Sequence, residues 1–241
     1  MLPVLQGNDV DDRDSAWSGF LWGAKIPNKK LYMQLKNDML EFAVTPLLPS
    51  RSYSEIIASM ILAGWGTVND VTGERCISND EMRSLLLKVD DEFRSRILWQ
   101  AQRWSGEKDE NSHSRWKKQL SDLLRIWPRQ LSARSPNTSA RLCELAFSSG
   151  EQFPTIAALV LPLLSRIERD HLMLPSPHTS EDNIIDRYPE KALALLYTVL
   201  PDNTLAWPYG MEKILQQIAD ADGKLNCDDR LISLKRQWDS R

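Results

Sequence analysis

Cysteine, histidine and glycine are scarce in this chain of 241 residues, which contains 3 cysteines, 3 histidines and 10 glycines. Cys76, Cys143 and Cys227 lie far apart, and no Cys-x-x-Cys pair occurs. This pattern predicts neither a disulfide framework nor a zinc site. Free thiols are typical of a reducing cytosol, so we expect a cytoplasmic protein.

Long apolar runs and a strong excess of one charge are also absent. The most apolar stretch, from Ile156 to Leu164, is too short to span a bilayer and contains Pro162. The first residues lack the basic and then apolar pattern of a secretory signal. The net charge of −3 does not favour binding of the whole chain to nucleic acid or to an anionic membrane. We therefore expect no membrane partner.

Motifs that carry catalysis or bind cofactors are missing as well. The pair Gly64 and Gly66 follows no predicted strand and lacks the third glycine of a dinucleotide loop. The segment 218–229 resembles a calcium loop only faintly, because Ile218 stands where the first ligand belongs. We interpret it as the end of a helix, with Gly223 in a left-handed cap. The sequence thus predicts no catalytic residue, no cofactor and no metal.

Helical periodicity is what the sequence has in abundance. Apolar residues recur at spacings of three and four from Leu31 to Phe42, and again from Trp116 to Trp127. The pair Ser78 and Glu81 has the spacing of a capping box. Alternation of apolar and polar residues, which is typical of a half-buried strand, does not persist over the length of a strand.

These patterns predict an all-α fold of about ten to twelve short helices. Both an irregular helical bundle and HEAT-like stacked helix pairs fit them. We expect residues 1–14 to form a flexible acidic lead and residues 15–241 to form a single α-helical domain. Sub-halves 15–135 and 136–241 are an alternative division of that domain.

Prolines mark several helix boundaries. Pro128 follows Trp127 at the end of an apolar stripe and should end that helix. Pro208, after Trp207, suits the first turn of the next one. Pro189 suits a first turn too, and Pro162 should kink or split the helix that contains it.

A basic stripe and several tryptophans are the candidates for an interaction surface. Basic residues flank the apolar stripe of the helix around Trp116, where they could contact phosphates or an acidic partner, although acidic residues nearby also fit a simply solvated face. Most of the 9 tryptophans occupy apolar helix positions, but three fit their stripes less well and suit docking of another domain. The candidate residues are Arg115, Lys117, Lys118, Arg125, Arg129, Trp22, Trp207 and Trp238.

Two further hypotheses stay open at this point. One is a nucleic-acid-sensing module that uses the basic stripe. The other is an enzyme whose site assembles only in the fold, for which His178, Glu181 and Asp186 are the residues to inspect.

Several segments, read in order, resemble one family over nearly the whole chain, from about Ala16 to Trp238. They are "AWSGFLW", "FRSRILWQAQRW", "SRWKKQLSDLLRIWPRQ", "RSPNTSARLCELAFSSGEQFPTIAALVLPLL", "RYPEKALALLYTVLPDN" and "WPYGMEKILQQIADAD". They are similar to the uncharacterised helical domain at the C-terminus of large bacterial proteins, where it often follows a sirtuin-like NAD-hydrolase domain. Such proteins are associated with antiphage defence.

The resemblance implies a sensor, scaffold or oligomerisation module and carries no catalytic residues onto this chain. No effector domain is recognised in the sequence. We therefore expect a protein partner or an effector of NAD-hydrolase or NTPase type, and self-association is a second expected interaction.

Overall fold

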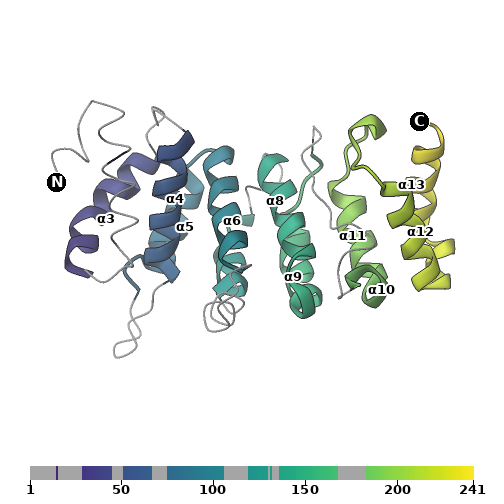
Figure 1. Ribbon diagram of the computed structural model, residues 1–241, viewed down its shortest axis with the longest axis horizontal. Coiled ribbons are helices and arrows are strands. Elements are labelled where there is room, and N and C mark those ends of the chain that lie inside the picture. The colour runs from purple at the N-terminus through teal and green to yellow at the C-terminus, as the bar shows by residue number, and fades with distance from the viewer. Residues whose placement is uncertain are drawn as a thin grey trace. The chain divides into compact units, whose positions relative to one another are not determined.

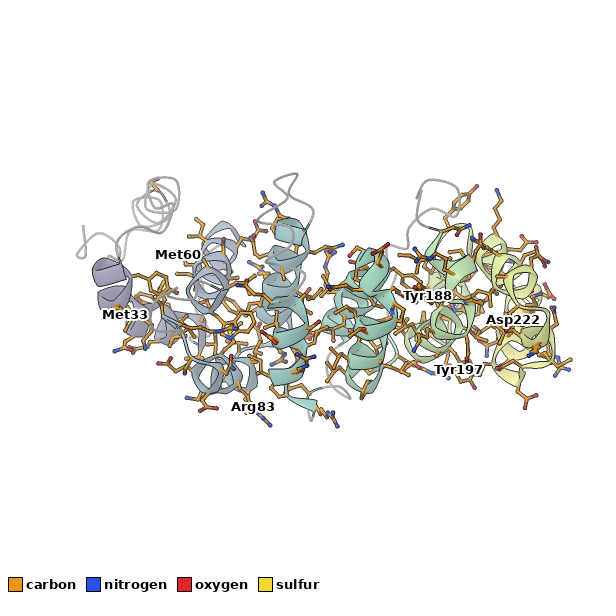
Figure 2. The ribbon with its side chains drawn as sticks, turned by 90° about the horizontal axis from the view of Figure 1, so that it is seen from below. Met33, Met60, Arg83, Tyr188, Tyr197 and Asp222 are labelled. Carbon is orange, nitrogen blue, oxygen red and sulfur yellow. The ribbon has the colours of Figure 1, made fainter. Side chains whose placement is uncertain are left out.

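The computed structural model describes residues 15, 29–44, 51–66, 75–105, 119–129, 131, 136–167 and 183–241, and Figure 1 shows its ribbon. Contacts group the chain into two compact units, Met1–Trp104 and Ser105–Arg241. We call them the N-terminal unit and the C-terminal unit and describe each by itself. The single domain expected over 15–241, its division at 135/136 and the flexible lead at 1–14 stay predictions.

The described residues are almost entirely helical, which confirms the all-α prediction, and they contain no β-strand. No described helix combines the length and the apolarity needed to cross a bilayer. The helices described between residues 29 and 105 are α3 (Lys29–Val44), α4 (Arg51–Gly66), α5 (Asn79–Lys88) and α6 (Asp91–Ser105). The C-terminal unit contains a helical stretch at 119–126, then α8 (Pro136–Phe147), α9 (Phe153–Val160), α10 (Ile184–Arg187), α11 (Pro189–Val199), α12 (Met211–Ala221) and α13 (Asp229–Asp239).

In the N-terminal unit, α3 and α4 approach closely at Tyr32. The Tyr32 hydroxyl donates a hydrogen bond of 2.8 Å to the carbonyl oxygen of Met60. Its ring lies against Gly64, where an added Cβ atom would overlap the phenol group. Glycine is therefore required at this position of α4. Burial raises the pKa of the Tyr32 hydroxyl above its ordinary value.

The start of α5 joins it to both earlier helices. Ser78 and Glu81 form the predicted capping box, with side-chain and backbone hydrogen bonds in both directions. The Glu81 carboxylate also accepts from Lys36 of α3 at 2.6 Å, and Asn79 accepts from the indole of Trp65 at 2.9 Å. The same residues thus cap one helix and fix its position against two others.

The C-terminal unit is built in layers around α11. Helices α8 and α9 pack on each other and both contact α11, which in turn contacts α12 and α13. The short α10 packs on α11 and α12. The core-facing residues of α11 are completely enclosed, which fits its place between two helix pairs; they are Ala192, Leu193, Leu195, Leu196 and Val199. This order matches stacked helix pairs.

Most proline predictions in this unit are confirmed. The helix of Phe153–Val160 passes at Pro162 into a 3-10 turn, η3 (Leu161–Leu163), and Pro189 is in the first turn of α11. The helical stretch at 119–126 ends just before the Trp127-Pro128 corner.

Two expectations are wrong. Pro208 lies before α12, whose N-cap is the left-handed Gly210, with φ of 83°. The carbonyl of Pro208 accepts a hydrogen bond from the amide of Met211 across this turn. Gly223 does not have the expected positive φ; it begins the 3-10 helix η5 (Gly223–Cys227), which Asp222 caps. The side chain of Asp222 stabilises that turn in place of a left-handed residue.

The substitution Gly64→Ala tests the contact between α3 and α4. We expect the free energy of unfolding to fall by about 1–3 kcal/mol, because displacing Tyr32 costs more than the gain of a helix-favouring residue. Gly223→Ala is the control, since nothing lies within 4 Å of its added Cβ. Denaturant unfolding of the two variants measures the difference, and equal stabilities would contradict the close approach.

The capping carboxylate predicts a pH dependence of stability. Burial opposes ionisation of Glu81, but hydrogen bonds from Lys36 and Ser78 outweigh it, so its pKa lies below the ordinary value. A depressed folded-state pKa stabilises the fold above the unfolded-state value of 4.5, and this stabilisation is lost as the pH falls through the folded-state value. Glu81→Gln should therefore lower stability at pH 7 and much less at pH 3.

The control for this measurement is Asp80→Asn in the same first turn, because Asp80 is exposed. Like Glu81, Asp80 places a negative charge near the N-terminus of the helix dipole, so the control measures the effect of removing that charge alone. A difference between wild type and Glu81→Gln that stays constant from pH 7 to pH 3 would contradict the assignment.

Candidate interaction surface

Trp207 and Trp238, predicted separately as docking residues, lie in contact with each other in the C-terminal unit. Their ring centroids are 6.2 Å apart and their planes differ by 28°, which is a stacked pair. Trp207 is only 3% exposed, and its indole nitrogen donates to the carbonyl oxygen of Pro201 at 2.8 Å. Trp207 is therefore a core residue, and Trp238 is the half-exposed member of the pair.

Two short helices present this pair. Asn203 caps the 3-10 turn η4 (Thr204–Ala206), which leads directly into Trp207. Asp228 caps α13, with its carboxylate accepting from the amide of Arg230. Because Leu231 and Leu234 face the core, α13 is held in a fixed rotation and brings Trp238 onto Trp207.

Two large side chains, each two residues from Trp207 in the sequence, are exposed to solvent. Leu205 is 69% exposed and Tyr209 is fully exposed at 106%. The guanidinium of Arg241 lies over Trp238, with Cζ 4.4 Å from the ring centroid, and it reaches the carbonyl oxygen of Leu205 at 3.5 Å. We call Leu205, Tyr209, Trp238 and Arg241 the Trp238 corner. Exposed aromatic side chains together with an arginine are a combination typical of protein interfaces.

The basic stripe is only partly within the described residues. Arg125 is exposed and pairs with Asp122 at 3.2 Å, and Arg129 is exposed at the Trp-Pro corner. The ion pair reduces the positive field that Arg125 can offer to phosphates. Arg115, Lys117 and Lys118 lie outside the described residues, as does Trp22.

The residues of the enzyme hypothesis are not all placed either. Asp186 is exposed on α10 and accepts from the side-chain amide of Gln217 on α12 at 2.9 Å, so its carboxylate links two helices. His178 and Glu181 lie outside the described residues. Among the described residues, no group of three or more histidine, cysteine or acidic side chains could hold a metal ion. Asp222 and Asp228, from the faint calcium pattern, are helix caps.

Leu205 and Tyr209 were not among the residues predicted from the sequence. Their signal is local, since Tyr209 stands between a proline and a glycine in "WPYG". Proline and left-handed glycine form tight turns that leave the intervening side chain in solvent. Helical periodicity does not reveal this segment, because the segment is too short to show a helical face.

The hydrogen bond from the Trp207 indole to Pro201 predicts that Trp207 and Trp238 differ in how well they tolerate replacement by phenylalanine. Trp207→Phe should lower the free energy of unfolding by about 1–3 kcal/mol, because the buried carbonyl of Pro201 loses its donor. Trp238→Phe keeps the stack and should cost less than about 1 kcal/mol. Denaturant unfolding of both variants checks this, and equal losses would show that the hydrogen bond to Pro201 contributes nothing.

Comparisons with known proteins give little functional information. No family model matches the chain, and no solved structure matches it. A region of 177 residues is 25% identical to "Uncharacterized protein y4cA" of Sinorhizobium fredii. The match covers 73% of this chain but only 14% of that protein. The chain is thus similar to a small part of a much longer protein.

Proposed function

We propose that this chain is a non-enzymatic helical interaction module of a bacterial antiphage-defence system, acting as a sensor or scaffold beside an effector on another domain or chain. The observation that carries the proposal is the Trp238 corner. Leu205 and Tyr209, each two residues from Trp207 in the sequence, are exposed to solvent, although burying such side chains is favourable whenever a partner is present. A monomeric protein rarely keeps large aromatic surface exposed without a use for it.

The rigidity of the corner supports a binding role. Trp207 is enclosed and hydrogen bonded, Asn203 and Asp228 cap the elements on both sides, and Trp238 has a ring stacked beneath it. Side chains that are already ordered lose little entropy on binding, which raises affinity without new contacts. A partner with an apolar surface and an acidic group matches Tyr209, Trp238 and Arg241.

The defence context rests on the family resemblance. The relative from Sinorhizobium fredii supports a place within a larger assembly, because the matched region is a small part of that protein. The proposed partner is therefore an effector of NAD-hydrolase or NTPase type, in the cytoplasm. Nucleic-acid sensing by Arg125, Arg129 and the rest of the basic stripe stays the alternative prediction.

Co-purification tests the proposal. The tagged chain is expressed together with a candidate effector of NAD-hydrolase or NTPase type, and the retained effector is quantified. We expect the double variant Leu205→Ala/Tyr209→Ala to retain about tenfold less effector, because these side chains supply the exposed apolar surface. Leu87→Ala is the matched control, since Leu87 is 41% exposed but lies on α5 in the N-terminal unit.

Two results would contradict the proposal. One is full retention of the effector by the double variant, with unchanged thermal stability. The other is NAD consumption at enzymatic rates by the purified chain alone, which would make it an enzyme. Binding to DNA or RNA that weakens steeply with salt would instead support the nucleic-acid alternative.

A further inference from the structure

Three contacts hold Arg241 at the Trp238 corner. Its backbone amide donates to the carbonyl oxygen of Trp238 at 3.2 Å. Its guanidinium lies over the Trp238 ring, with Cζ 4.4 Å from the centroid, and reaches the carbonyl oxygen of Leu205 at 3.5 Å. The preceding Ser240 is held as well, because its hydroxyl donates to the carbonyl oxygen of Gln237 at 3.0 Å. These contacts order the guanidinium before a partner binds.

The positive charge of Arg241 has no acidic partner in the part of the chain that the structure describes. By contrast, Arg125, Arg166 and Arg230 each pair with an aspartate. A guanidinium has five N–H donors in a planar fork, and the carbonyl of Leu205 accepts from only one nitrogen. The remaining donors can bind an acceptor on another molecule. A carboxylate matches them, because it accepts two parallel hydrogen bonds from an arginine.

The charge balance of the C-terminal segment favours a carboxylate over a polyanion. Residues 201–241 contain seven acidic and six basic side chains, and Asp202 and Asp239 are both exposed. Nucleic acid presents a row of phosphates, which several cations bind together. Acidic residues near a single arginine repel such a row, whereas one carboxylate can still pair with Arg241.

The small size of the corner suits a short segment better than a folded surface. Stable interfaces between folded proteins use about 20–30 residues a side. The corner offers the two exposed side chains of Leu205 and Tyr209, one half-exposed ring and one guanidinium. Exposed positions elsewhere on α12 and α13 include charges of both signs, among them Glu212, Lys213 and Arg236. Recognition of short acidic motifs by arginine is a recurring mode of peptide binding.

We propose that the Trp238 corner binds a short acidic segment of the partner protein. An aspartate or glutamate of that segment pairs with Arg241, and a neighbouring aromatic or aliphatic side chain packs on Leu205, whose carbonyl Arg241 contacts. The inference rests on the proposed function and names the chemical class of partner that the same surface takes. Arg241 supplies specificity, because an uncharged segment would leave its donors unpaired at the interface.

Selection of peptides from a random library displayed on phage, with the full chain immobilised, is the test. The bound peptides should be enriched in an acidic residue close to an aromatic or aliphatic one. A synthetic copy of the most enriched peptide should bind the full chain at least about tenfold more tightly than its amide version, in which Asn or Gln replaces the acidic residue, because only the carboxylate pairs with Arg241. Isothermal titration calorimetry measures both dissociation constants.

Variants of the chain separate ion pairing from apolar packing. Arg241→Gln should weaken binding of the acidic peptide about tenfold and abolish its advantage over the amide version, whereas Arg241→Lys should keep part of that advantage. Leu205→Ala should weaken both peptides equally, because it removes apolar surface and no charge. Arg236→Gln is the matched control, since Arg236 is exposed on the same helix, and it should leave both affinities unchanged. Circular dichroism and thermal melting establish that each variant is folded.

Three outcomes would overturn the inference: a selection that enriches no acidic residue, an affinity for the acidic peptide that Arg241→Gln leaves unchanged, or tight binding of a single-stranded oligonucleotide that depends on Arg241. The proposed function fails separately. If acidic peptides bind through Arg241 but Leu205→Ala/Tyr209→Ala retains the effector in full, only the assignment of the effector to this surface fails. If the effector is retained through Leu205 and Tyr209 while the selected peptides carry no acidic residue, only the acidic segment fails.

Discussion

Enclosure of α11 between two helix pairs is the constraint on which the C-terminal unit depends. Because Leu193, Leu196 and Val199 have no access to solvent, α8 and α9 must cover one side of this helix and α12 and α13 the other. Helices α12 and α13 then bury one face and leave the opposite face to solvent. The Trp238 corner is a consequence of that arrangement, since Trp238 belongs to α13, which packs on α11.

The sequence predicted the helices well because their signals are local. The capping box at Ser78, the first-turn proline at 189 and the interruption at Pro162 depend on neighbouring residues alone, and each is found where expected. Pro208 was placed wrongly because a proline two residues before a glycine fits two arrangements. Proline can begin a helix, or it can form a turn that the left-handed Gly210 completes, and the structure has the second.

The candidate surface was harder to predict because it depends on contacts between distant segments. Trp207 and Trp238 were noted for fitting their helix stripes poorly, but periodicity cannot show that they stack on each other or that one is enclosed by the Pro201 turn. Gly64 is a similar case. Its neighbours in the sequence give no sign that a glycine is needed, whereas the ring of Tyr32, far away in the sequence, is the reason that a side chain does not fit there.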